Sequence, residues 1–323
     1  MPMMKTFFAR IPLLFVFCIS IRAFSLDFTG AGSFAKAFSA FSNTDEKALS
    51  FYSLTVPSGG RAEALGGAYT ALSDDSFCID YNPAASSLLE QNEIALFHNI
   101  WIAGAAMETA AAAARHGDLG FGGELRFFYV PFYEYGAFGE RSADSLYSET
   151  SATFNISYNI LAGYYFKGIA IGANAKVLWR SMPDTSGSVV SSVSLSRSAL
   201  ALASDAGVML RFNAGKFFAS REPNLRLALC VRNAGAAITG FGEKIKTDDP
   251  LPTSVSLGLS YRPLKRLLTA MEFKQPVNLS NIGNYMPGTA GCAVELTVTD
   301  FFAIFSGCTF SAHENAPYIR FQS

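Results

Sequence analysis

The amino-acid sequence predicts an all-β fold, a transmembrane antiparallel β-barrel that follows a separate N-terminal segment. Three observations carry this prediction: an export signal, the absence of a long apolar run after it, and a repeated alternation of apolar and polar residues. The 323 residues are 50% hydrophobic and only 16% charged, against about 25% charged in a typical soluble domain. So much apolar surface excludes intrinsic disorder. The formal net charge of −1 gives no indication of a nucleic-acid partner.

Residues 1–25 have the organisation of a secretory signal peptide. Lys5 and Arg10 form its positive region, residues 11–21 form its apolar region, and small residues place the cleavage after Ser25. The alternative is a membrane anchor, but this apolar run is much shorter than the about 20 residues that span a bilayer as a helix.

No stretch after residue 25 reaches the about 18 continuous apolar residues of a transmembrane helix. A closed β-barrel is the other backbone arrangement that can span lipid, because all its amides pair internally. We therefore expect an exported protein of the outer membrane, in contact with outer-membrane lipid.

Alternation with a period of two supports the barrel. In residues 168–180, Ile171 and the other odd positions are mostly apolar, whereas Asn174, Lys176 and Arg180 lie at even positions. Successive side chains of a strand point to opposite faces, so we expect the odd positions to face lipid and the even positions to face the lumen. About twelve segments are expected to be strands: 93–102, 103–115, 118–130, 151–166, 168–181, 198–212, 223–233, 252–262, 265–274, 288–298, 300–310 and 316–322.

Short turns alternate with longer polar gaps at 131–150, 182–197, 235–251 and 275–287, as in outer-membrane barrels. One segment conflicts with the pattern, because 103–115 contains the alanine run 110–114 and alanine is the best helix former. A strand is still expected there, since its neighbours need a hairpin partner. A periplasmic β-sandwich is the alternative fold, but the polar faces here are rich in Ser, Thr, Asn and Gly rather than Lys and Glu.

Residues 26–90 lack a sustained period and are dense in turn-forming residues. Gly66 and Gly67 permit a tight backbone, Asp74 and Asp75 can cap a turn, and Asn82-Pro83 initiates another. A compact, turn-rich segment before a barrel is a candidate plug, so the expected domains are the signal peptide 1–25, the plug 26–90 and the barrel 91–323.

The same segment resembles the N-terminal hatch of FadL-type outer-membrane transporters. Residues 66–75 and Asn82-Pro83-Ala84 carry the resemblance, and 226–235 and 251–262 are similar to strands of the PorV-like branch and its spirochaetal relatives. The resemblance implies fourteen strands and a hatch that shifts to admit long-chain fatty acids or other hydrophobic molecules. The residue count after position 90 is small for fourteen strands, so the expected number is 12–14.

The sequence contains no HExxH, GxSxG or P-loop motif, and its three histidines have no partner motif. We therefore expect no enzyme, no catalytic residue, no cofactor and no metal site. Asp74, Asp75 and Asp80 could bind calcium, but their spacing lacks the Gly and Glu of an EF-hand, which favours turn capping.

Four cations on the predicted strands are candidates to hold a ligand carboxylate or to act as lumenal charges: Arg115, Arg126, Lys176 and Arg180. The favoured interpretation for the arginines is lumenal salt bridging with Glu108, Glu124 or Glu295.

Three functional hypotheses follow. The first is import of a hydrophobic small molecule such as a long-chain fatty acid, gated by the hatch. The second is a PorV-like adaptor that binds protein partners and transports nothing. The third, a barrel enzyme such as a lipase, needs a Ser-His pair that the sequence does not suggest.

Overall fold

The computed structural model describes residues 50–101, 104–135, 141–160, 166–182, 198–220, 222–239, 246–247, 250–279, 287–299, 301–311 and 318–322. The chain divides into Met1–Asn43 and Thr44–Ser323, and every described element belongs to the second unit. The expected signal peptide and its cleavage after Ser25 lie outside the described residues, as does the first part of the expected plug, residues 26–49. No helix in the described ranges is long and apolar enough to cross a bilayer.

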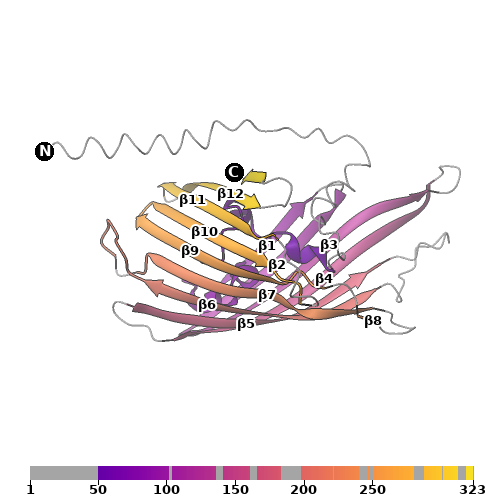
Figure 1. Cartoon of the computed structure of the whole chain (residues 1–323), viewed down its shortest axis with the longest axis horizontal. Helices are drawn as coiled ribbons and strands as arrows, with labels where there is room; N and C mark the ends of the chain where they lie inside the picture. Colours follow the sequence, from indigo (N-terminus) through magenta and orange to yellow (C-terminus); the bar gives the residue numbers. More distant parts are fainter. Residues whose placement is uncertain are drawn as a thin grey trace. The chain divides into compact units, whose positions relative to one another are not determined.

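The structure is all-β, with one antiparallel sheet of thirteen strands in its described part (Figure 1). The sheet follows chain order from β1 to β13, except that the two-residue β8 pairs only with β7, so β9 lies next to β7. The strands are β1 Glu93–Ile100, β2 Ala106–His116, β3 Leu119–Tyr135, β4 Arg141–Ile160, β5 Phe166–Ser181, β6 Ala199–Phe212, β7 Leu225–Thr239, β8 Lys246–Thr247, β9 Ser254–Leu264, β10 Leu267–Pro276, β11 Thr289–Thr299, β12 Phe302–Ser311 and β13 Tyr318–Gln322. The number of strands lies within the expected 12–14.

Strand β5 shows how the sequence divides the two faces of the barrel. Ile171 and Val177 are 42% and 44% exposed, whereas Asn174 and Lys176 are 4% and 3% exposed. The predicted alternation is therefore confirmed for this strand, with apolar side chains outside and polar side chains inside. Large apolar side chains are exposed along most of the other strands as well. An outer face of this kind indicates an apolar surrounding.

The alanine run predicted as a strand is confirmed as β2. Ala110 lies opposite Leu96 of β1 and Leu125 of β3, so the segment pairs on both edges. Two complete ladders outweigh the helix propensity of alanine, because propensity is a weak preference that tertiary context overrides.

The prediction of a long loop at 131–150 is wrong. β3 continues to Tyr135 and β4 begins at Arg141, and the two pair from Pro131–Leu146 to Tyr135–Arg141. The predicted gap at 235–251 is also partly strand, since β7 continues to Thr239 and pairs with β8. These parts carry no apolar face, so periodicity does not reveal them. Their backbone groups are nevertheless satisfied by pairing with one another.

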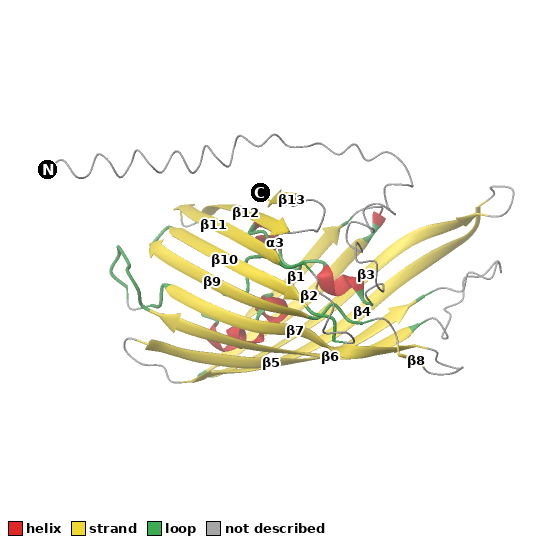
Figure 2. Cartoon of the chain, in the orientation of Figure 1, coloured by secondary structure: helices red, strands yellow, loops and turns green. Residues whose placement is uncertain are grey.

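Residues 50–90, here called the inner segment, form four short helical turns and the bends between them (Figure 2). The turns are η1 Tyr52–Thr55, α3 Gly60–Ala64, α4 Cys78–Tyr81 and η2 Pro83–Leu88. They contact the inward faces of the strands. The turn η2 by itself contacts five of them, β2, β3, β4, β5 and β6.

Glycines on the inward face make this approach possible. A Cβ atom on Gly172 of β5 would lie 2.3 Å from the carbonyl oxygen of Pro83, and one on Gly307 of β12 would lie 2.3 Å from the carbonyl carbon of Leu65. Both distances are far below van der Waals contact, so a side chain at either position would displace the inner segment.

Candidate functional site

Asn82 organises the centre of the inner segment. Its side chain is fully buried; Oδ1 accepts a hydrogen bond from the Ala84 amide at 3.1 Å, and Nδ2 donates to the Thr70 carbonyl at 3.1 Å. The first bond caps η2, and Pro83 occupies the first position of that helix, where a missing N–H costs nothing. Asn82 thus holds two stretches of the inner segment together.

Gly66 and Gly67 form a tight bend against β12. Both have positive φ, 64° and 73°, which favours glycine. The Gly66 carbonyl accepts a hydrogen bond from Thr309 Oγ1 at 2.9 Å. A Cβ on Gly66 would also lie 3.1 Å from the amide nitrogen of Cys308, so this glycine meets two constraints.

Asp74 and Asp75 have different partners. Asp74 pairs with Arg61, which also binds Glu295 of β11 at 2.8 Å. Arg61 thus links the inner segment to the strands of the barrel, here called the wall. Asp75 accepts hydrogen bonds from the Tyr69 hydroxyl at 2.7 Å and from the Phe77 amide at 3.0 Å. Burial opposes ionisation of both, but Arg61 lowers the pKa of Asp74, whereas burial raises the pKa of Asp75 above its ordinary value.

Asp80 and Arg126 form a buried ion pair between the inner segment and β3. Arg126 Nη2 lies 2.9 Å from Asp80 Oδ2 and 3.1 Å from Glu124 Oε1, and its Nη1 donates to the Ser53 carbonyl at 2.8 Å. Burial alone would raise the pKa of Asp80, but Arg126, Lys176 and Arg232 lower it below the ordinary value. Arg126 therefore anchors the inner segment with most of its donors already used.

The other predicted cations are also engaged. Lys176 Nζ lies 2.8 Å from Asp205 Oδ2 and donates to Asn233 Oδ1 at 2.8 Å. Arg180 donates to Ser50 Oγ at 3.2 Å, and Arg115 donates to the carbonyls of residues 117 and 89. Of the acids expected as partners, Glu124 pairs with Arg126, Glu295 pairs with Arg61, and Glu108 contacts His98.

A ladder of side-chain amides joins β4, β5 and β6 to the inner segment. Asn155 Nδ2 donates to Asn174 Oδ1 at 2.7 Å, and Asn174 Nδ2 donates to Asp205 Oδ2 at 2.7 Å. The same two amides donate to the carbonyls of Pro83 and Ile79. The wall thereby satisfies backbone acceptors that would otherwise be buried unpaired.

Two wall carboxylates that sequence reasoning missed bind consecutive amides of the inner segment. Glu149 of β4 accepts from the Tyr52 and Ser53 amides at 3.1 and 2.7 Å. Glu272 of β10 accepts from the Tyr69 and Thr70 amides at 3.0 and 2.9 Å. Glu272 is an isolated acid on the polar face of the predicted strand 265–274, which is the signal that could have identified it. Glu149 lies in the gap 131–150, where periodicity gives no such signal.

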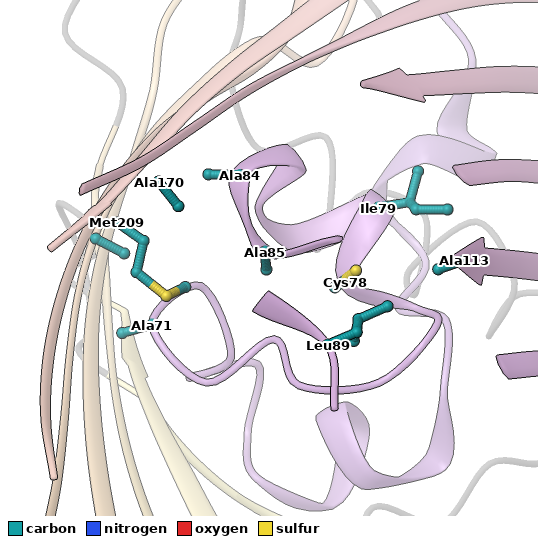
Figure 3. Close-up of a cluster of buried hydrophobic side chains, with 10 residues drawn as sticks. Ala71, Cys78, Ile79, Ala84, Ala85, Leu89, Ala113, Ala170 and Met209 are labelled. Atoms are coloured by element: carbon teal, nitrogen blue, oxygen red, sulfur yellow. The ribbon is translucent and has the colours of Figure 1, made fainter. Parts of the chain in front are cut away.

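Apolar contacts fill the space between these polar anchors (Figure 3). Ile79, Ala84 and Leu89 of the inner segment belong to one buried cluster with Ala170 and Met209 of the wall. Cys78 lies in the same cluster, and burial raises the pKa of its thiol well above the ordinary value. The wall contributes mainly alanines here, so the fit depends on small side chains.

A cavity of about 210 Å³ remains between the inner segment and the wall. The inner segment contributes residues 54–57 together with Glu63, Gly66, Gly67, Asp80 and Tyr81. The wall contributes Arg232, Glu272, Lys274, Thr289, Gly291 and Thr309. No group of three or more His, Cys, Asp or Glu side chains arranged for a metal occurs among the described residues.

Two solved structures share the fold. The Pseudomonas putida toluene transporter TodX aligns with a TM-score of 0.52 and 13% identity, over 79% of this chain and 84% of that chain. The TodX deltaS2S3 mutant monoaromatic hydrocarbon channel aligns with a TM-score of 0.51 at the same identity, over 79% and 83%. These likenesses support the β-barrel as the fold; the expected fatty-acid ligand remains a proposal.

Curated relatives give the family. A UPF0164 protein of Treponema pallidum (strain Nichols) is 30% identical over 233 residues, which are 70% of this chain and 51% of the relative. A second from the same organism is 27% identical over 250 residues, 75% of this chain and 50% of the relative. The chain thus spans about half the length of these relatives. The model of the Uncharacterised protein family (UPF0164) matches residues 27–321, and the chain belongs to that family.

Proposed function

We propose that the chain is an outer-membrane channel for hydrophobic small molecules, long-chain fatty acids among them, and that residues 26–90 are its hatch. The observation that carries the proposal is the attachment of residues 50–90 to inward-facing side chains around the barrel. Glu149, Arg126, Glu272 and Thr309 each bind this segment from a different strand. A segment held in this way closes the lumen, so passage requires it to move.

The nature of the contacts supports movement. Most are hydrogen bonds and ion pairs between polar groups, which water can replace when the segment shifts. A gate needs a second arrangement only a few kcal/mol above the first, which populates that arrangement at roughly 0.1–10%. TodX is a toluene transporter and its deltaS2S3 mutant is a monoaromatic hydrocarbon channel, and the likeness in fold supports a hydrophobic ligand for this chain.

An engineered disulfide between the inner segment and the barrel tests whether the inner segment must move during transport. Ser86 Oγ of η2 lies 2.6 Å from Ser157 Oγ of β4. Two sulfur atoms at these positions would lie near the about 2.0 Å of a disulfide bond. We expect the Ser86→Cys/Ser157→Cys protein, reconstituted in liposomes, to lose solute flux on oxidation and regain it on reduction.

The single variants Ser86→Cys and Ser157→Cys are the matched controls, because they meet the same oxidant and carry the native cysteines without the new bond. Flux that persists at full strength in the oxidised double variant would exclude a moving hatch. A protein that passes no hydrophobic solute in either state, but copurifies with a defined protein partner, would instead support the PorV-like adaptor.

A further inference from the structure

Two wall cations line the cavity and retain unused hydrogen-bonding capacity. Lys274 of β10 makes no hydrogen bond or ion pair within the described ranges of the chain. Arg232 of β7 donates to the Asp80 carbonyl at 3.3 Å and to Ser256 Oγ at 3.4 Å, both long, and its buried Nε has no acceptor in the described structure. An arginine carries five N–H donors, so most of those on Arg232 are available.

Glu272 and Asp80 lie within electrostatic range of both cations, but among the described residues neither acid forms a direct ion pair with them. Asp80 is held by Arg126 and Ser58, and Glu272 by the amides of Tyr69 and Thr70. The third acid, Glu63, forms no ion pair with either cation in the part of the chain that the structure describes. An anion that entered the cavity would therefore meet two cations not yet neutralised by direct contact.

The remaining lining and the volume limit what such an anion can be. Leu54, Val56 and Tyr81 offer apolar surface beside the cations. The volume of about 210 Å³ lies below the roughly 300–1,000 Å³ of pockets for drug-sized ligands. An apolar cavity of about 150 Å³ is enough for benzene. One ring or a short chain with one charged group fits, whereas a long acyl chain does not.

We propose that this cavity binds a compact monocarboxylate, aromatic or short-chain, with its carboxylate on Lys274 and Arg232 and its apolar part against Leu54, Val56 and Tyr81. The proposal rests on the channel function above and narrows its ligand. Thr289 begins β11 and Thr309 lies near the end of β12, so the cavity lies toward the end of the sheet where β10 and β12 end and β11 begins. A ligand that enters from this end of the strands meets the cavity at the inner segment.

Binding to the detergent-solubilised full chain tests the proposal by calorimetry, with no need for transport. Benzoate and toluene form a matched pair of similar size that differ in the carboxylate, benzylamine reverses the charge, and palmitate keeps the carboxylate but lengthens the chain. We expect benzoate to bind at least about tenfold more tightly than toluene or benzylamine, the effect of one charge-assisted contact. Palmitate should not displace it.

Variants assign the contact to Lys274. Lys274→Gln should weaken benzoate binding at least about tenfold and leave toluene unchanged, whereas Lys274→Arg should retain benzoate. The control is Lys216→Gln, because Lys216 lies in the β6–β7 connection with its own carbonyl partners. Equal binding of benzoate and toluene, or full benzoate binding by Lys274→Gln, would overturn the site. Lys274-dependent binding in a protein that carries no flux would sustain the site and reject the channel.

Discussion

Arg126 Nη2 lies 2.9 Å from Asp80 Oδ2, and this contact joins the wall strand β3 to α4 of the inner segment. Arg126 is 1% exposed and Asp80 is 9% exposed, so the pair is largely shielded from water. The formation of such a buried ion pair costs desolvation free energy. The removal of one partner costs more, because the remaining partner stays charged in a medium of low polarity.

Removal of this arginine should release the inner segment without unfolding the barrel. Arg126→Met leaves Asp80 and Glu124 buried without their cation, which we expect to cost about 3–5 kcal/mol of docking free energy. Arg61 is the only basic residue of the inner segment, so faster trypsin cleavage there reports release. The exposed Arg266→Met is the control. Unchanged cleavage in Arg126→Met, with heat-modifiable migration intact, would contradict the anchoring role.

Acid should also loosen the inner segment. The pKa of Asp80 is lowered in the docked state. Its contribution to the docking free energy of the inner segment is therefore fully present above the ordinary pKa of about 3.9 and is lost as pH falls further. Asp75 has a raised pKa in the docked state, so its contribution to the docking free energy is present at low pH and is lost as pH rises through this raised pKa. We expect conductance in lipid bilayers to increase below about pH 4, and Asp80→Asn to remove part of this pH dependence. Asp75→Asn should leave the acid-induced increase in place.

The outward face of β5 should reject charge. Ile171→Arg is expected to lower the free energy of unfolding by about 2–4 kcal/mol, the value for a position near the bilayer midplane. Phe217→Arg, in the β6–β7 connection, should change the free energy of unfolding by less than about 0.5 kcal/mol, as surface substitutions usually do. Urea unfolding in lipid vesicles measures both. Equal costs would show that Ile171 does not face lipid.

The pairing of β11 with β12 can be tested with native cysteines. Cys292 and Cys308 are directly opposite in the register, and facing Cα atoms of antiparallel strands are about 4.5–5.5 Å apart, within disulfide range. Diamide should therefore join these two, as detected by peptide mass spectrometry, whereas the fully buried Cys78 and Cys230 should remain alkylatable thiols after unfolding. A disulfide that involves Cys78 would require a different register or a displaced inner segment.

The sequence predicted the features that depend on neighbouring residues. Alternation identified which face of β5 carries Ile171 and which carries Asn174, because a strand imposes that period locally. It missed the continuation of β3 to Tyr135, where neither face is consistently apolar. It also could not find the partners of Glu149 and Glu272, since the amides that they bind are 96 to 203 residues away in the chain.

The candidate cations show the same limit. The spacing of Arg126 and Lys176 placed both in the lumen. Only the fold shows that Arg126 is already paired with Asp80, and Lys176 with Asp205. Lys274, on an equally ordinary strand, lines the cavity together with Arg232. Which lumenal charge remains available depends on where the inner segment docks, and its docking is fixed by long-range contacts.

A single methyl group should separate docking of the inner segment from stability of the barrel. Gly172→Ala places a Cβ 2.3 Å from the Pro83 carbonyl oxygen and 2.6 Å from the Ala84 amide nitrogen. Both are backbone atoms that cannot rotate away, so η2 must shift. Gly123→Ala is the matched control, because its Cβ would meet only the Thr153 carbonyl oxygen at 3.6 Å, an ordinary contact. We expect Gly172→Ala to raise basal conductance and trypsin cleavage at Arg61 while the barrel unfolds at the same urea concentration as Gly123→Ala. Identical conductance in the two variants would show that η2 does not control access to the lumen.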